Sequence, residues 1–253
     1  EYKKEVIDNY GRIFSYDEVG KYSNKIKSVC DSIVNGKGIV LIYSEHIDGG
    51  VVPMALAIEE LGYQRYGKTK SLFKKPPTDR KGAYIIISGS KLYSPNNNDE
   101  IKAATREDNK NGDIIKVIII SRAGAEGIDF KCIRQIHLME PWYNLNRTDQ
   151  IIGRGVRTFS HLSLPFKERN VQIFLHGTLL NIMNNNEAVD LYIYRKAEDK
   201  SIKIGKITRI LKQNAIDCVL NVEQNSFTEE MINMEVKQEL STGEKIDYKV
   251  GDK

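Results

Sequence analysis

The sequence predicts an α/β fold in which a parallel sheet carries helices on both of its faces. Short runs that are apolar throughout alternate along the chain with longer segments whose apolar residues recur at helical spacing. Strands that are apolar throughout are typical of parallel sheets, because both faces of such a sheet are covered. The regular alternation of strand and helix therefore favours a three-layer arrangement.

The elements follow one another in a consistent order. Residues 22–35 carry apolar side chains at helical spacing, and Ser23 or Asn24 is the expected N-cap of that helix. Residues 39–43 form a short apolar strand, and residues 53–61 form a helix that a glycine ends. Further strands are predicted at residues 83–88, 114–120, 135–139 and 171–175.

The C-terminal part differs from this pattern. We expect residues 195–221 to be helical, with their apolar side chains packed back on the sheet. These side chains are Ile202, Ile204, Ile207, Ile210, Leu211 and Ile216. Residues 222–253 are polar and weakly periodic, and form either a tail that docks a partner or a partly disordered segment. The predicted division is a lead-in from a preceding lobe at 1–20, an α/β lobe at 21–195, and a helical extension with its tail at 196–253.

The composition limits the class of protein. A chain of 253 residues with 40% hydrophobic content can bury the core of one large domain and an appendage. The chain begins at Glu1 without a methionine, and we expect it to be cut from a longer protein. The net charge of +4 is compatible with binding a phosphate backbone but is also that of an ordinary lysine-rich surface.

Cysteine usage and hydropathy point to a reducing compartment and to no membrane partner. Three cysteines lie in apolar runs without pairing motifs, and we interpret them as small buried side chains. They are Cys30, Cys132 and Cys218. No apolar run reaches the roughly 18 residues that a membrane span needs, and no signal peptide is visible. The four histidines have no metal-ligand spacing, so no metal site is predicted in this chain.

The most informative segment is QIIGRGVR, in which Gln150, Arg154 and Arg157 are spaced so that one helical stripe carries all three. The side chains expected on the core side of this helix are Leu145, Thr148, Ile151, Ile152 and Val156. Gly153 and Gly155 each cost about 1 kcal/mol inside a helix, which suggests that something approaches the backbone closely. Paired arginine forks match phosphate oxygens.

The strand before this helix leads into a turn of small residues. The strand at 114–120 ends at Ser121, and residues 123–127 then leave its carboxyl end. Ligands of open α/β sheets bind at that end of the strands. Asp129 follows in the same turn, where we expect it to accept hydrogen bonds from a ribose or from an arginine.

These segments carry a family resemblance. AGAEGIDF at 123–130 resembles motif V, and QIIGRGVR resembles motif VI, of superfamily 2 DExH-type helicases and translocases. EPWYN at 140–144 resembles the chromatin-remodeller (SWI/SNF-like) branch. The fuller collinear pattern, over residues 13–221, is similar to nucleoside triphosphatases and early transcription factors of poxviruses and other large DNA viruses. Its other parts are IFS at 13–15, YSNKI at 22–26, GIVLIYS at 38–44, IIISG at 85–89, RNVQIFLHGT at 169–178 and NAIDCVLN at 214–221.

The resemblance implies a RecA-like fold and a shared ATP site. In such helicases ATP and Mg²⁺ lie between two lobes, and the N-terminal lobe, which is missing here, supplies the phosphate loop and the metal-binding acid. The C-terminal lobe would supply Arg154 and Arg157 to the γ-phosphate, with Gln150 orienting the nucleotide or an arginine. The residues implied to face the nucleotide are Gly127, Asp129 and Gly153, together with Glu126, which instead pairs with a motif VI arginine in the alternative assignment.

The resemblance also implies a nucleic-acid surface at the strand ends. The implied contacts are Ser44, Ser88, Gly89, Ser121 and Arg122. A hydroxyl at such a position can donate to phosphate, but serines at strand ends are also ordinary turn formers. The implied partners are DNA or RNA, the N-terminal helicase lobe, and an RNA polymerase or transcription-factor subunit. The implied location is the virion and host cytoplasm for a viral protein, and otherwise an intracellular compartment.

The sequence and the resemblance are therefore compatible with three functions. The first is the C-terminal lobe of an ATP-dependent helicase or translocase in viral transcription, which hydrolyses little or no ATP by itself. The second is a non-catalytic module of a transcription-initiation factor that binds nucleic acid or polymerase. The third is a remodeller-type translocase of double-stranded DNA.

Some local patterns have simpler interpretations. The string at 62–69 matches a Walker A motif, but a helix precedes it and prolines follow it, so we reject a phosphate loop. The basic segment at 63–82 is interpreted as a mobile solvated loop or as an insertion that faces nucleic acid. Trp142 and Tyr143 are expected to form a structural turn and not a base-stacking platform, and His137 to be a core histidine.

Overall fold

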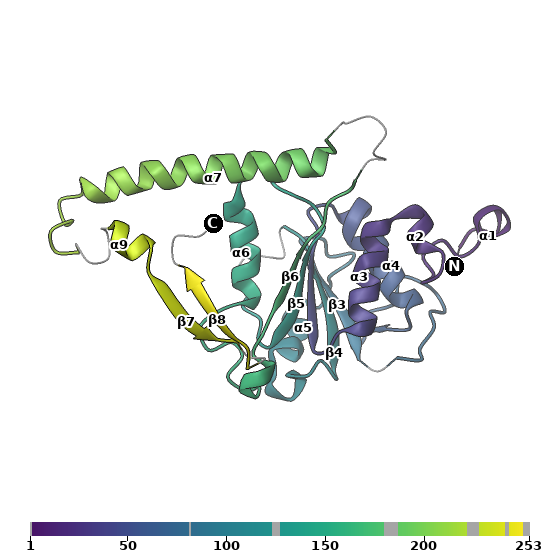
Figure 1. Ribbon diagram of the computed structural model, residues 1–253. Helices are drawn as coiled ribbons and strands as arrows, with labels where there is room; N and C mark the ends of the chain where they lie inside the picture. Colours follow the sequence, from purple (N-terminus) through teal and green to yellow (C-terminus); the bar gives the residue numbers. More distant parts are fainter. Residues whose placement is uncertain are drawn as a thin grey trace.

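A parallel sheet lies at the centre of the lobe, between its helices (Figure 1). It has six strands in the order β2-β3-β4-β1-β5-β6. All of its neighbouring strands run parallel, as the sequence predicts. The strands are β1 (Ile39–Tyr43), β2 (Gln64–Arg65), β3 (Ala83–Ile87), β4 (Ile115–Ile120), β5 (Ile133–Leu138) and β6 (Gln172–Leu175). The computed structural model describes residues 2–80, 82–122, 127–179, 187–221, 228–240 and 243–249.

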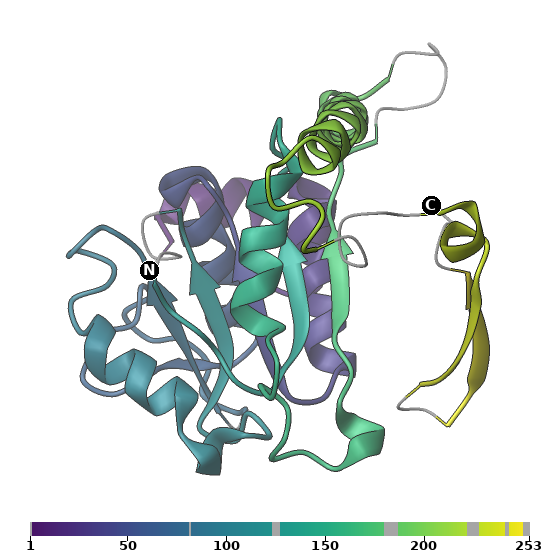
Figure 2. The same ribbon diagram turned by 90° about the vertical axis from the view of Figure 1, so that its left-hand side faces the viewer.

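Helices cover both faces of the sheet, which confirms the predicted α/β class (Figure 2). In β1, Val40 and Ile42 enter one core while Leu41 and Tyr43 enter the other, as the alternation of side chains along a strand requires. The first face carries α3 (Asn24–Asn35) and α4 (Val52–Glu60), and the second carries α5 (Asn97–Thr105) and α6 (Leu145–Gly155). Both cores consist mainly of isoleucine, valine and leucine.

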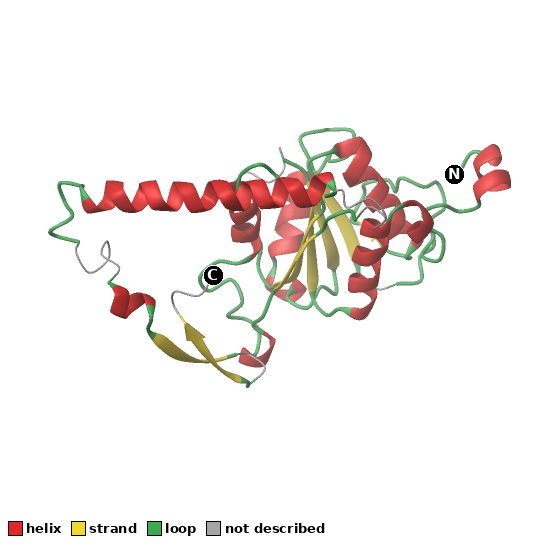
Figure 3. Ribbon diagram, turned by 45° about the horizontal axis from the view of Figure 1, so that its top comes forward, coloured by secondary structure: helices red, strands yellow, loops and turns green. Residues whose placement is uncertain are grey.

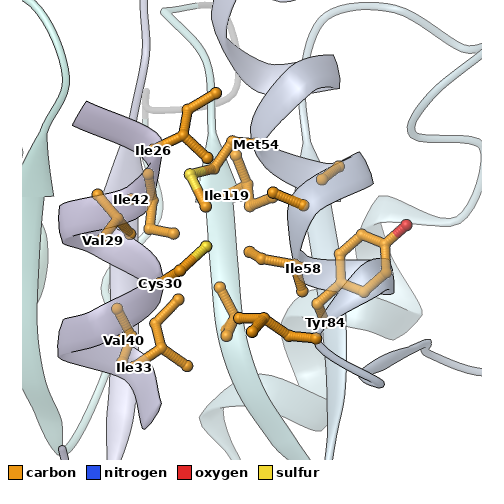
Figure 4. Close-up of a cluster of buried hydrophobic side chains, with 14 of the residues drawn as sticks. Ile26, Val29, Cys30, Ile33, Val40, Ile42, Met54, Ile58, Tyr84 and Ile119 are labelled. Atoms are coloured by element: carbon orange, nitrogen blue, oxygen red, sulfur yellow. The ribbon is translucent and has the colours of Figure 1, made fainter. Parts of the chain in front are cut away.

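Helix α3 shows how the sequence forms these layers. The Ser23 side chain accepts a hydrogen bond from the backbone N–H of Ile26 at 3.3 Å, which confirms one of the two predicted caps. Its buried stripe includes Val29, Cys30 and Ile33, and packs against the strands beside α4 (Figure 4). Burial of each large aliphatic side chain contributes about 1.5–3 kcal/mol.

The basic segment that follows α4 is anchored at its middle. The buried carboxylate of Glu59 accepts hydrogen bonds from the backbone N–H groups of Leu72 and Phe73, both at 2.7 Å, and from the hydroxyl of Tyr84. An unpaired buried carboxylate would be costly, so these bonds fix the course of the segment. The segment is therefore held to the lobe at Leu72 and Phe73, which leaves both interpretations of its basic residues open.

The Walker-like string does not form a phosphate loop, in agreement with the sequence-based rejection. Gly62 follows the end of α4 with a φ of 95°, and the short strand β2 comes next. The hydroxyl of Thr69 donates to the buried carboxylate of Glu100 at 3.0 Å. No helix begins at Lys68 or Thr69 in this described segment, so amides and helix dipole do not converge on a ligand there.

The C-terminal part corrects one prediction. Helix α7 (Val189–Gln213) extends beyond the sheet, and Ala197 is its buried residue (Figures 1 and 3). The apolar residues expected to pack on the sheet, Ile202, Ile204, Ile207, Ile210, Leu211 and Ile216, are all exposed. Residues 195–213 are helical as predicted, whereas residues 214–221, which include Ile216, form turns and not helix. The period of the apolar residues predicts a helix but does not say which surface covers them.

The remaining elements are short. They are α1 (Lys4–Tyr10), α2 (Val19–Tyr22), the π-helical turn η1 (Ile47–Val51), the 3₁₀ turns η2 (Glu107–Asn109) and η3 (Phe166–Glu168), α9 (Glu229–Ile232), and the antiparallel hairpin of β7 (Glu235–Glu239) and β8 (Lys245–Lys249). The sequence predicted neither this hairpin nor α5. Among the described helices, none has the length and apolar character needed to cross a membrane.

His137 is a core histidine, as predicted. It is fully buried, with Nδ1 3.0 Å from Nε2 of His176 and Nε2 3.3 Å from Oε1 of Gln135. The ring of Phe174 stacks on it at 4.5 Å. Burial, with a smaller contribution from His176, lowers the pKa of His137 to about 3.

The two glycines of α6 should respond oppositely to substitution by alanine. A Cβ at Gly155 would lie 3.0 Å from Ile136 Cδ1 and 3.2 Å from Ile133 Cβ, so Gly155→Ala should lower the free energy of unfolding by about 1–3 kcal/mol. A Cβ at Gly153 meets nothing within 4 Å, so Gly153→Ala should raise it by up to about 1 kcal/mol. Urea denaturation of the two variants measures both changes, and equal effects would contradict this packing.

The stability of the fold should fall in acid because of His137. Its pKa is lower in the folded chain than in the unfolded one, so its contribution is present above about pH 6.5 and is lost as the pH falls towards 3. Between pH 7 and pH 5 this group should account for about 2 kcal/mol of the lost free energy of unfolding. His137→Phe should flatten that dependence in urea titrations, whereas Phe174→Leu, which keeps the imidazole, should not. Equal slopes for wild type and His137→Phe would refute the assignment.

Candidate functional site

Three serines form a row at the carboxyl edge of the sheet. Ser88, Ser121 and Ser44 directly follow β3, β4 and β1, which are neighbours in the sheet. The N–H of Ser121 donates to the carbonyl of Ile87 at 3.0 Å, and the N–H of Ser44 donates to the carbonyl of Ile120 at 3.1 Å. These bonds continue the ladder, so the structure brings the three serines into register.

The hydroxyls of this row differ in their partners. Ser44 is buried and donates to Oε1 of Glu140 at 2.9 Å, and the Ser88 hydroxyl lies 2.9 Å from that of Ser94. Both hydroxyls are therefore used within the fold, as expected of turn formers. The Ser121 hydroxyl is buried and has no hydrogen-bond partner in the described structure, which costs about 1–3 kcal/mol. Ser121 is the member of the row with unused hydrogen-bonding capacity.

The row opens on one side into a cleft. Exposed Gly89 follows Ser88, and together they line a cleft of about 800 Å³ with Lys91 and the start of α5 at residues 96–99. The N-terminus of a helix and a lysine both favour anions. Lys91 is therefore placed to meet a phosphate next to the serine row, while Asp99 in the first turn of α5 adds a negative charge to the lining.

Arg122 continues the row and is mostly exposed. Its Nη1 lies 3.5 Å from Oε1 of Glu45, whose other oxygen is hydrogen-bonded by Arg147. The guanidinium of Arg147 lies 3.6 Å from the centroid of the Trp142 ring. This contact covers the indole and agrees with the structural role predicted for Trp142, while Tyr143 remains exposed.

The predicted arginines lie at the opposite end of α6. This helix runs antiparallel to the strands, because it connects two parallel strands, and Gly155 packs against Ile133 at the start of β5. Arg154 Nη1 is 3.7 Å from Asp129 Oδ1, and Arg157 Nη1 is 2.5 Å from Asp129 Oδ2. Asp129 thus accepts from arginine, one of its two predicted partners.

The placement of Asp129 and the arginines corrects the predicted edge. Asp129 was expected in the turn at the carboxyl end of β4, but the chain has already crossed to the amino end of β5 when it reaches this residue. The N–H of Phe130 donates to the carbonyl of Arg154 at 2.8 Å, which fixes the crossover to the end of α6. The arginine cluster and the serine row are therefore two separate sites.

The helical stripe is also corrected. Helix α6 ends at Gly155, and Val156 is extended, with φ −118° and ψ 93°, and exposed. Arg157 is therefore outside the helix, and Val156 is not a core residue. Of the other residues of the predicted core side, Thr148 and Ile151 are buried and Ile152 packs against the second core, while Leu145 is half-buried.

The remaining predicted residues divide into open and packed positions. Gly127 has a φ of 74° and Gly153 is helical, and a Cβ at either would meet nothing within 4 Å, so both backbones are open to a ligand. Gly155 is instead required by packing against β5. Gln150 is exposed on α6, and Glu126 lies outside the described residues.

Sequence reasoning missed the carboxylates of the serine row. Glu140 accepts from Ser44 and, at 3.2 Å, from the N–H of Glu45, and burial raises the pKa of Glu140. The sequence signal that could have indicated Glu140 is its position at the start of EPWYN, directly before Pro141. Within the described ranges, no group of three or more acidic, histidine or cysteine side chains is arranged to hold a metal ion.

The parallel six-stranded sheet with helices on both faces is that of a RecA-like lobe. Residues 24–159 match the family described as the helicase conserved C-terminal domain, and the chain belongs to this family.

Relatives of the chain come from large DNA viruses. It is 33% identical over 217 residues to "Putative helicase 087L" of Invertebrate iridescent virus 3, covering 82% of this chain and 21% of that protein. It is 27% identical to a termination factor NPH-I homolog of African swine fever virus, covering 79% of this chain and 33% of that protein. It is 28% identical to nucleoside triphosphatase I of Heliothis armigera entomopoxvirus, covering 87% of this chain and 30% of that protein. The chain thus spans between a fifth and a third of these relatives.

Proposed function

We propose that this chain is the C-terminal lobe of an ATP-dependent nucleic-acid helicase or translocase that acts in viral transcription. The observation that carries the proposal is the convergence of Arg154 and Arg157 on Asp129, with 56% of the Arg157 side chain exposed. The names of the viral relatives, which include a nucleoside triphosphatase and a termination-factor homolog, support the same reading.

The arginine cluster fits a nucleotide phosphate. ATP bound with Mg²⁺ supplies a phosphoryl group whose transfer develops negative charge on its oxygens. Arg154 and Arg157 would stabilise that charge, and an arginine in this role contributes about 10³–10⁵ in rate. Before the nucleotide binds, Asp129 holds both guanidinium groups close together. The open backbones of Gly127 and Gly153 would allow close approach of the nucleotide.

The metal ion would be held elsewhere. Because the described residues provide no cluster of metal ligands, we assign the Mg²⁺-binding acid and the phosphate loop to a separate N-terminal lobe. The Walker-like string of this chain is occupied by structural hydrogen bonds and does not replace that loop. We infer that the chain alone hydrolyses little or no ATP.

The nucleic acid, DNA or RNA, would lie along the serine row. Ser121 offers its unused hydroxyl, Arg122 an exposed guanidinium, and Gly89 an open approach to the cleft beside α5. Phosphate contacts of this kind position a strand without reading its sequence. Ser44 and Ser88 would act indirectly, by shaping the ends of their strands.

A second function remains as an alternative. The exposed apolar side chains of α7 would suit a module that binds polymerase or another transcription factor without catalysis. An experiment on the intact protein distinguishes the two functions. A variant without ATPase activity still recruits polymerase under the alternative, and loses its transcriptional role under the helicase proposal.

Loss of either arginine should stop turnover. In the intact protein, Arg154→Ala and Arg157→Ala should each lower the turnover number for ATP by about 10³-fold or more, because the transition-state charge loses its partner. Nucleotide affinity, measured by fluorescent-analogue binding, should change by only about threefold, because the finger contacts form mainly in the transition state.

Arg106→Ala is the matched control, since Arg106 forms an exposed ion pair with Asp108 far from α6 in sequence. Its turnover should equal that of wild type. Survival of turnover in both finger variants would rule out the assignment, whereas equal losses in the control would indicate general damage to the fold.

A further inference from the structure

One carboxylate at the serine row holds two arginines from different elements. Glu45 directly follows Ser44, Arg122 directly follows Ser121, and Arg147 lies in the first turn of α6. Arg122 and Arg147 each approach one oxygen of Glu45. The carboxylate therefore connects the edge where nucleic acid is proposed to lie with α6, the helix that carries Arg154 near its C-terminal end.

The two contacts differ in strength. Arg147 is only 18% exposed, hydrogen-bonds to Glu45 and is held over the Trp142 ring. Arg122 is 64% exposed, and its 3.5 Å separation from Glu45 is longer than the roughly 2.7–2.9 Å of a charge-assisted hydrogen bond. An exposed ion pair of this kind contributes about 0–1 kcal/mol. Arg122 can therefore leave Glu45 at little cost, while Arg147 cannot.

The groups around Glu45 favour an anion as the new partner of Arg122 when it leaves Glu45. The N–H of Glu45 donates to Oε2 of Glu140, so a second carboxylate lies directly behind it. Glu140 is largely buried and is also hydrogen-bonded by Ser44. A phosphate that enters the row meets these negative groups unless a cation comes between them, and Arg122 is the exposed cation within reach of Glu45.

We propose that Glu45 is a positioning residue that restrains Arg122 in the free lobe and releases it to a nucleic-acid phosphate, after which its carboxylate is left to Arg147 alone. This inference rests on the proposed function, because it assumes that nucleic acid lies along the serine row. Its consequence is regulatory: occupation of the row changes the charge balance at the start of α6, whose other end carries the arginine finger.

The decisive variant is Glu45→Gln, which keeps the shape of the side chain and removes its charge. In the intact protein it should bind a fluorescein-labelled 20-nucleotide single strand, as DNA or RNA, about three- to tenfold more tightly at 0.1 M salt, because Arg122 no longer has a competing partner. Anisotropy titration measures this. Asp108→Asn is the matched control, because it also removes one negative charge from a surface arginine pair, and its affinity should stay within about twofold of wild type.

Arg122→Ala tests the mechanism itself. It should weaken binding at least threefold, and Glu45→Gln should have no further effect in the Arg122→Ala background, since the residue that Glu45 restrains is gone. An equal gain from Glu45→Gln with and without Arg122 would show a general charge effect and overturn the inference. Because Arg122 is exposed, Arg122→Ala will fold, and an unchanged affinity in this variant overturns the inference even where Glu45→Gln is unstable.

The coupling to α6 has its own readout. Stimulation of ATP turnover by the same oligonucleotide, expressed as the ratio of stimulated to basal rate measured for each variant, should fall at least twofold in Glu45→Gln. An unchanged ratio together with tighter binding overturns the regulatory part. Failure of the wild-type protein to bind either strand overturns the proposed nucleic-acid function, and this inference with it, whereas wild-type binding with an unaltered Glu45→Gln overturns this inference alone.

Discussion

The packing of α6 across β5 is the constraint on which both candidate sites depend. Gly155 lets the helix end lie directly against Ile133, and buried Thr148 and Ile151 hold the helix along the strand. Eleven residues of helix span about 16 Å. Since a crossover helix runs against its strands, the seven-residue step from Arg147 to Arg154, about 10 Å along the helix axis, leads from the carboxyl edge towards the amino end. A shift of α6 along β5 would move Arg147 and Arg154 together, each away from the carboxylate that it contacts.

The sheet could be predicted from sequence because its strands are apolar throughout and bounded by turns, so five of its six strands were located. The two-residue strand β2 carries no such signal, and α5 begins with polar residues that equally suit a turn. The position of Ser44, Ser88 and Ser121 at one edge of the sheet could be predicted, because the carboxyl ends of parallel strands lie at the same edge. The position of Arg157 outside the helix could not be predicted, because nothing in the sequence GRGVR marks the residue at which α6 ends. The pairing of Glu45 with Arg147 joins residues 102 positions apart, and no local pattern contains it.

Buried polar groups show which parts of the fold are fixed. Glu59 is satisfied by two backbone amides and a tyrosine, and His137 by its neighbours His176 and Gln135. Such networks stabilise one arrangement, because each member left unpaired would cost the full desolvation of a polar group. The buried hydroxyl of Ser121 departs from this rule. It lies beside the proposed phosphate path and not in the core networks, which is where unused hydrogen-bonding capacity is expected in a binding site.

The two sites share one electrostatic arrangement. Glu45 holds Arg147, which is 18% exposed, and Arg122, which is 64% exposed; Asp129 holds Arg154, which is 21% exposed, and Arg157, which is 56% exposed. In each case one arginine is fixed by the fold and the other faces solvent. An arginine without a partner would sample many rotamers, and ordering it on binding would cost about 1.5–2 kcal/mol. A shared carboxylate restricts that freedom, through a 3.5 Å ion pair for Arg122 and through a hydrogen bond of 2.5 Å for Arg157. Both contacts are largely exposed to solvent, so a phosphate, with its greater charge, can replace them. The lobe thus keeps its exposed arginines ordered without burying them.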